Sequence, residues 1–147
     1  MAKNLTSSRI DRQNILNNES AIEEIQSQTR IQGILFEGKI CFTKAMVATF
    51  FEIDTRIIER YVAEYQTEIS DNGYELLKGK YLKDFLKSIQ EQDVPDINVG
   101  NISNKTPQIA IFDFKSFLNL VMLLVESEPA KSLHQVMLDM GNSKYAI

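Results

Sequence analysis

The chain has 147 residues, a hydrophobic content of 44% and a formal net charge of −4. This size fits one domain with a sizeable core, and the acidic balance excludes a basic footprint over the whole chain. A single cysteine excludes an internal disulfide framework and a CxxC metal site. The sequence shows no apolar N-terminal signal and no apolar run long enough to span a membrane, so we expect a cytoplasmic protein.

The first part of the chain, residues 1–29, is predicted to be a polar and partly flexible segment. Residues 1–18 are rich in Asn and Ser, which favours flexibility. Ser20 and Glu23 have the spacing of a capping box, which predicts a short helix over residues 20–28.

Residues 30–147 are predicted to form a single domain that begins with a β-hairpin. The apolar run Ile31 to Phe36 reads as a strand, and Lys39 to Phe42 reads as its return strand. The two residues between them, Glu37-Gly38, suit a tight turn.

Two short helices joined by a tight turn are predicted directly after the hairpin. Thr43 can cap the N-terminus of the first helix, and Asp54 can cap the second, which we expect to run from Thr55 to about Glu68. This arrangement predicts a helix-turn-helix, whose second helix can enter a DNA major groove. The turn position that often holds glycine is Glu52, and the alternative is an ordinary helical corner in a globular core.

The rest of the chain predicts further helices around a small amount of sheet. First come a turn at residues 70–73, an extended piece at 75–77 and a helix whose buried face is Tyr81, Leu82, Phe85, Leu86 and Ile89. A long loop or wing at residues 93–107 and a strand at 108–112 follow. The last two elements are a central apolar helix from Phe114 to Glu126, capped by Asp113, and a helix from Pro129 to Met140 that ends at Gly141. The fold class is therefore α+β, with a winged-helix-like helix-turn-helix core, a small hairpin and additional packed helices.

The order of these elements resembles the N-terminal DNA-binding domains of phage antirepressor-like and RhuM-like (Bro-N-type) virulence proteins of bacteria. The residues that carry the resemblance are Gly33 to Phe42, Thr43 to Phe51, Ile53 to Tyr61 and Ile111 to Phe114. The resemblance implies that the hairpin supports the helix pair and that the second helix lies on DNA. Such domains are often fused to a second module, and the tail after residue 141 gives no ending signal, so the chain is also read as a piece of a longer protein.

Candidate DNA-binding residues lie on the predicted helix pair and on the helix after it. They are Thr43 and Lys44 at the start of the first helix, Thr55, Arg56 and Arg60 on the second, and a basic cluster of Lys78, Lys80, Lys83 and Lys87. Arginine can pair with guanine through two hydrogen bonds, threonine can contact a phosphate or a thymine methyl, and the lysines can follow a phosphate backbone beside the helix pair. The alternative is that both sets are solvated helix faces with local ion pairs.

These observations predict a regulatory module that binds double-stranded DNA and is not an enzyme. No nucleotide-binding loop, zinc pattern or nucleophile motif is present, so no cofactor or metal is predicted. A single acidic domain would bind DNA weakly, so we expect a homodimer or a partner module in the intact protein. The expected contact surface is an exposed apolar stripe on the last helix, formed by Leu133, Val136, Met137 and Met140. Two alternatives remain: a protein-interaction domain that keeps the helix-turn-helix shape, and the non-catalytic N-terminal domain of a toxin-type protein.

Overall fold

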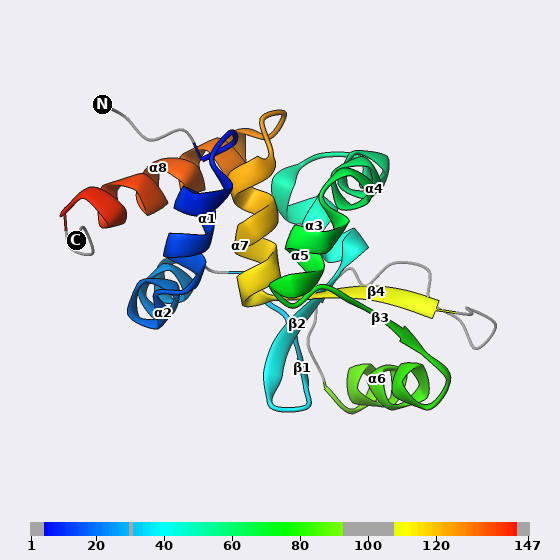
Figure 1. Cartoon of the computed structure of the whole chain (residues 1–147). Coiled ribbons are helices and arrows are strands. Elements are labelled where there is room, and N and C mark those ends of the chain that lie inside the picture. Colours follow the sequence, from blue (N-terminus) through cyan, green and yellow to red (C-terminus); the bar gives the residue numbers. More distant parts are fainter. Residues whose placement is uncertain (1–4, 30, 93–107, 144–147) are drawn as a thin grey trace.

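The computed structural model describes residues 5–29, 31–92 and 108–143 and is an α+β structure. In these ranges it contains eight helices and four strands (Figure 1). The helices are α1 (Arg9–Leu16), α2 (Glu19–Gln28), α3 (Lys44–Phe51), α4 (Thr55–Glu64), α5 (Gln66–Asp71), α6 (Gly79–Glu91), α7 (Phe114–Leu123) and α8 (Glu128–Ser143). The strands are β1 (Ile34–Phe36), β2 (Lys39–Thr43), β3 (Glu75–Lys78) and β4 (Gln108–Asp113). The loop or wing predicted for residues 93–107 lies outside the described residues.

The four strands form one antiparallel sheet in the order β1-β2-β4-β3. The predicted hairpin is confirmed: Phe36 pairs with Lys39 across the turn, and both turn residues have positive φ, 51° at Glu37 and 79° at Gly38. This is the backbone that a two-residue hairpin turn requires. The strand predicted at residues 108–112 is present as β4, and it lies between β2 and β3.

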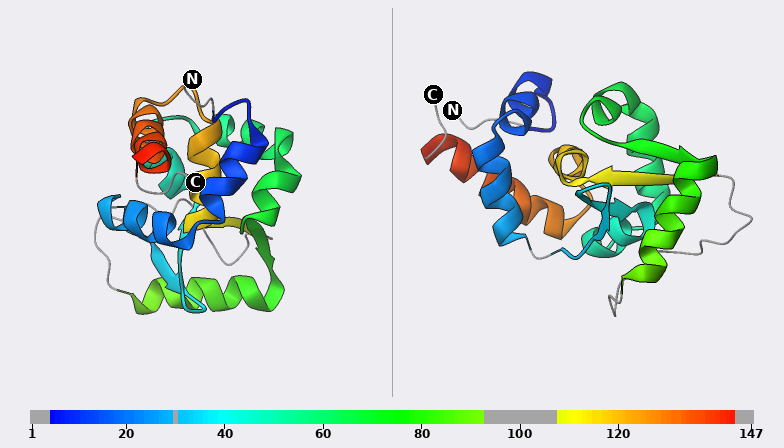
Figure 2. Two further views of the ribbon diagram at one scale, coloured as in Figure 1. Left: turned by 60° about the vertical axis from the view of Figure 1, so that its left-hand side comes forward. Right: turned by 90° about the horizontal axis from the view of Figure 1, so that it is seen from below.

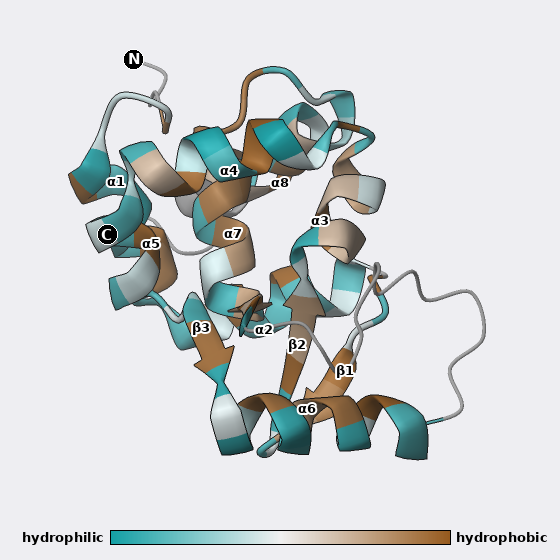
Figure 3. Ribbon diagram, turned by 90° about the vertical axis from the view of Figure 1, so that its right-hand side faces the viewer, coloured by the Kyte–Doolittle hydropathy of each residue, from teal (hydrophilic) through white to brown (hydrophobic). Residues whose placement is uncertain are grey.

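Helices cover both faces of the sheet. On one face lies α6, where the Phe36 and Phe85 rings meet edge to face at 5.2 Å. Figure 3 shows the hydrophobic residues of α6 on the side toward the strands. On the other face lies α7, where Phe42 packs against Phe117 at a ring distance of 5.4 Å.

Helix α7 is the centre of the core, as its apolar sequence predicts. Every residue of α7 except Lys115 is buried. Asp113 caps the helix as predicted, because the Ser116 N–H donates to the Asp113 carboxylate at 2.8 Å. The helix ends at Leu123, three residues before the predicted end.

The N-terminal segment differs from its prediction, because residues 9–16 form α1 instead of a flexible stretch. Helices α1 and α2 pack against α7 and α8 respectively, as the second view of Figure 2 shows for α2 and α8. The predicted helix at residues 20–28 is present as α2, but its cap is Asn18, whose side chain accepts from the Ala21 N–H.

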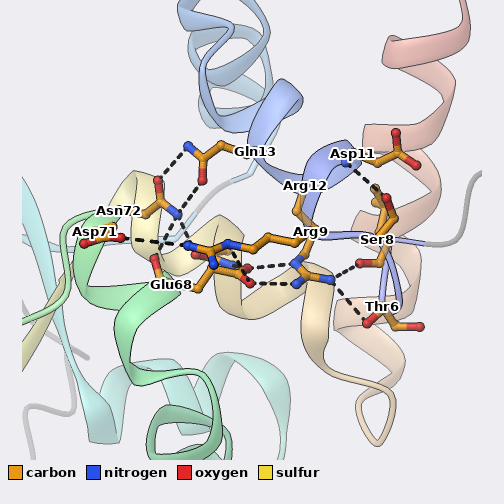
Figure 4. A network of polar contacts seen from close by, with 11 residues as sticks. Thr6, Ser8, Arg9, Asp11, Arg12, Gln13, Glu68, Asp71 and Asn72 are labelled. Carbon is orange, nitrogen blue, oxygen red and sulfur yellow. Dashed lines mark hydrogen bonds and ion pairs between the residues drawn. The ribbon is translucent and has the colours of Figure 1, made fainter.

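Buried polar contacts join α1 to α5 and α7 (Figure 4). The Arg12 guanidinium donates to both carboxylate oxygens of Glu68, from Nε at 2.7 Å and from Nη2 at 2.6 Å. The Asn119 amide donates to Glu68 Oε2 at 2.6 Å, and Arg12 Nη1 donates to the Leu5 carbonyl at 2.7 Å. A charged pair in the interior is tolerated because each charge has hydrogen-bond partners.

Further predicted boundaries and faces are also wrong. The helix expected to reach Glu68 ends at Glu64, where Tyr65 leaves helical geometry with φ −115° and ψ 30° before α5 begins. Tyr81 is 61% exposed and does not belong to the buried face of α6. The last helix runs past Gly141 to Ser143.

The predicted dimer stripe on α8 is mostly part of the core. Leu133 and Met137 are buried, and Val136 is half-buried against the same cluster. A face that already packs inside one copy is not free to contact a second copy. These residues of α8 therefore do not support a dimer contact.

Candidate nucleic-acid interface

The α3–α4 corner begins with the cap that the sequence predicts. The Thr43 hydroxyl accepts from the Met46 N–H at 3.2 Å. At the other end of α3, Glu52 adopts the left-handed conformation with φ 57°, and Ile53 N–H bonds back to the Ala48 carbonyl at 3.1 Å. This is the usual ending of a helix at a glycine, and here a glutamate takes the position.

The corner packs into the core through its apolar residues. Val47, Phe51 and Ile58 are fully buried, and the Phe51 ring stacks on Phe117 of α7 at 5.2 Å. The orientation of α4 is thus fixed by the core. Its polar side faces solvent.

The side chain of Thr43 is not accessible to DNA. It is 2% exposed, and its hydroxyl is used as the cap of α3. Thr43 is therefore left out of the interface, although the sequence made it a candidate.

Arg56 is the most accessible basic side chain of the corner. Its side chain is 84% exposed, and its Nε and Nη2 each lie 3.2 Å from one carboxylate oxygen of Asp54. Asp54 also caps α4 by accepting from the Arg56 N–H at 2.8 Å. The side-chain and backbone hydrogen bonds from Arg56 hold the pKa of Asp54 below its ordinary value. The carboxylate therefore braces the arginine at the first turn of α4.

The other two basic residues of the corner are also paired. Lys44 Nζ lies 2.5 Å from Glu59, and Arg60 Nη2 lies 2.5 Å from Glu126, which follows α7. Glu126 also accepts from the Tyr61 hydroxyl at 2.8 Å. Burial raises the pKa of the Glu126 carboxyl, but the hydrogen bonds from Tyr61 and Arg60 outweigh it and hold that pKa below its ordinary value.

Thr55 completes the set of candidates on α4. It is the first residue of α4, directly before Arg56, and it is half-exposed. Thr55 and Arg56 together form the accessible part of the first turn, which is the part of a recognition helix that meets base edges.

The lysine set does not lie beside the corner, contrary to the prediction. Lys78, Lys80, Lys83 and Lys87 are all exposed, at the start of α6 and along it. Figures 1 and 3 show α6 at the opposite end of the molecule from α4, with the sheet between them. Asp84 and Glu91 are exposed on the same helix and offset part of the lysine charge. One short duplex on α4 would not reach this set in the same copy.

Sequence reasoning missed two acidic residues of the site. The bracing role of Asp54 had a signal, because Asp54 and Arg56 are only two positions apart and Asp54 was already expected as a cap. The contact between Glu126 and Arg60 had none, since it joins residues 66 positions apart through the fold.

Other kinds of site find little support in residues 5–29, 31–92 and 108–143. No group of three or more His, Cys, Asp or Glu side chains in these ranges is arranged to hold a metal. The ring of His134 contacts the Val121 carbonyl, and burial lowers its pKa below the ordinary value. None of the described helices is both long and apolar enough to cross a membrane.

The chain was compared with protein-family models, with curated proteins and with solved structures, and none of them matches it. A function for this chain is therefore inferred from the geometry of the α3–α4 corner and from the family that its sequence resembles.

Proposed function

We propose that the chain is a DNA-binding module of prokaryotic or phage origin with a regulatory role, of the RhuM-like or antirepressor-like type. In this proposal α3 and α4 are a helix-turn-helix, and α4 lies in the major groove of double-stranded DNA. The observation that carries it is the exposed Arg56, held in one direction by Asp54 at the first turn of α4.

The braced arginine has the chemistry of a base reader. A guanidinium has five N–H donors in a plane, and Asp54 takes one from Nε and one from Nη2. The remaining donors on Nη1 and Nη2 point away from the brace and can form the two bonds to guanine O6 and N7. Because the brace limits the rotamers of Arg56 before binding, less conformational entropy is lost when the base is bound.

Further contacts would come from the neighbouring polar groups. Thr55 would meet a phosphate or a thymine methyl, and Lys44 and Arg60 would meet phosphates by exchanging their carboxylate partners for the DNA backbone. This exchange costs part of the phosphate attraction, so binding by one copy should be weak and strongly dependent on salt.

A second candidate function is binding of a protein partner, and one observation favours it. Between Lys44 and Glu64 there are three basic residues and four acidic ones, and Glu126 adds a further carboxylate to the same surface. An acidic surface of this kind attracts a basic partner and repels a phosphate backbone. Each of the three basic side chains already has a carboxylate partner, which strengthens this alternative.

The DNA proposal is tested by titrating the folded protein against random duplexes at increasing salt and then against the duplex selected from them. Arg56→Ala should cost about 1–3 kcal/mol at the preferred site and relax the selectivity at one base pair. Lys83→Ala removes a similar exposed charge from α6 and is the matched control, which should leave the affinity unchanged.

Two results would contradict the proposal. One is a folded protein with no affinity for any duplex at low salt, which would favour the protein partner instead. Charge reversal at Glu59 and Glu64 would then be the next test against a basic partner. The other is an equal loss of affinity in both variants, since that would exclude a specific contact by Arg56.

A further inference from the structure

Strand β1 is one edge of the sheet, and a side chain occupies its open backbone. The pairing of Phe36 with Lys39 across the two-residue turn leaves the N–H and C=O of Leu35 pointing away from β2. Gln92, which follows the C-terminus of α6, binds both groups. The Leu35 N–H donates to Gln92 Oε1 at 2.9 Å, and Gln92 Nε2 donates to the Leu35 carbonyl at 2.8 Å.

The carboxamide of Gln92 thus takes the place of a neighbouring strand. A primary amide has the donor and the acceptor of a peptide group, and it forms here the same pair of bonds that an antiparallel strand would form with Leu35. A single glutamine holds this position, and its Nε2 also donates to the Ser88 carbonyl at 3.0 Å. One side chain is easier to displace than a paired strand, because only its own rotamers change.

Pairing at this edge would bury the exposed apolar side chain of Leu35. It is 53% exposed, while its neighbours Ile34 and Phe36 are buried. An edge strand with an exposed apolar residue is a template for another strand.

We propose that β1 pairs with β1 of a second copy of this chain, antiparallel, about a two-fold axis at Leu35. The two pairs of bonds to Gln92, one pair in each copy, are replaced by two bonds shared between the two Leu35 residues, so the N–H and C=O of each Leu35 stay paired and the released Gln92 amides bond to water. The gain comes from the two leucine side chains, which meet on the same face of the joined sheet. A two-fold contact needs a surface that is complementary to itself, and the N–H and C=O of one residue satisfy this condition.

The charges near the axis permit this arrangement. Glu37 is two residues past Leu35, so the two copies of Glu37 lie about four residues apart along the strands, roughly 13 Å. That exceeds the screening length of about 8 Å at physiological salt. The residue opposite Glu37 is Gly33, which has no side chain to collide with it.

The experiment measures the mass of the full chain by sedimentation velocity over a wide range of concentration. The wild-type protein should form a dimer as concentration rises. Leu35→Lys and Leu35→Glu should each remain monomeric, because two like charges would meet at the axis. A one-to-one mixture of these two variants should restore the dimer, since opposite charges then face each other.

Two further variants complete the test. Leu76→Lys changes an exposed leucine on the other edge strand, β3, and should leave the dimer intact. Gln92→Ala removes the competing amide and should lower the dissociation constant of the dimer. Circular dichroism confirms that each variant is folded before it is compared.

The proposal is overturned if the wild-type protein and Gln92→Ala are both monomeric at the highest concentration. It is also overturned if the variants at Leu35 still form dimers, if their mixture stays monomeric, or if Leu76→Lys abolishes the dimer as well. Binding of an unrelated extended peptide at β1 without self-association would assign the edge to a different partner and would equally reject the pairing of two copies.

Discussion

At the scale of single residues, stability should depend on keeping both members of the buried pair Arg12–Glu68. Both side chains are nearly inaccessible, and they join α1 to α5 across the core. A buried pair of this kind adds little compared with apolar residues of the same size, but removal of one partner leaves the other charge without compensation. This pair could not be predicted from sequence, because Arg12 lies in a polar stretch that reads as flexible.

Arg12→Ala should lower the free energy of unfolding by about 3–5 kcal/mol, because Glu68 stays buried without its main donor. Urea denaturation followed by circular dichroism measures this change. Arg9→Ala is the control: Arg9 lies 3.9 Å from Glu68 and its side chain is 59% exposed, so its loss should cost less than about 1 kcal/mol. Equal effects of the two changes would contradict the buried pair.

Glu68 should also make stability depend on pH. Burial raises its pKa, but the hydrogen bonds from Arg12 and Asn119 outweigh burial and hold the pKa below the ordinary 4.5. A carboxyl with a lowered pKa in the folded state stabilises the protein above the unfolded-state pKa, and this contribution is lost as pH falls through the folded-state value. The unfolding free energy should therefore decrease below about pH 4.5, and Glu68→Gln should flatten that part of the profile. An unchanged acid limb in the variant would contradict this assignment.

At the scale of elements, Ser127 fixes how α8 meets the end of α3. Its hydroxyl donates to the Phe51 carbonyl at 2.7 Å and accepts from the Ala130 N–H at 3.2 Å. One buried side chain therefore satisfies the open C-terminus of α3 and the open N-terminus of α8. The position of the α3–α4 corner depends on this junction.

Ser127→Ala should cost about 2 kcal/mol, because α8 loses its cap and the Phe51 carbonyl is left without a partner. The change is measured as a shift of the thermal midpoint together with the urea midpoint. Ser132→Ala removes an exposed hydroxyl from the same helix and should change stability by less than about 0.5 kcal/mol. A loss at Ser127 no larger than that at Ser132 would show that the junction has no energetic role.

The starts of α3, α4 and α7 were predictable from sequence, and the ends of α4, α7 and α8 were not. Thr43, Asp54 and Asp113 cap their helices as predicted, because a cap depends on groups within three residues. The break at Tyr65 carries no glycine or proline signal, and tertiary packing decides it. The same division holds for the site: the Asp54–Arg56 brace is local, and the contact of Arg60 with Glu126 depends on the whole fold.

At the scale of the whole molecule, the α+β class followed from the sequence and the topology of the sheet did not. A strand at residues 108–112 was recognisable, but the alternation of its residues does not say which strands it pairs with. For the same reason the spacing of the apolar residues of α8 predicts a dimer surface, although the structure packs most of them in the core. Periodicity identifies a hydrophobic face, and only the packed structure shows whether that face is already covered.

The central place of β4 has a consequence for how a newly made chain folds. The ribosome releases every element from α1 to α6 before β4, and of the strand pairs of the sheet only β1–β2 can form by then. Strand β3 has no strand partner until β4 has been made. When β4 pairs with β2 and β3, it closes two long loops at once, one between Cys41 and Asp113 and one between Glu75 and Ile111. Closing such loops costs chain entropy before contacts repay it. Because α7 follows β4 directly, the same late step completes the sheet and adds the central helix. A nascent chain stalled before residue 108 would therefore contain α3 and α4 without α7, the helix that orients them.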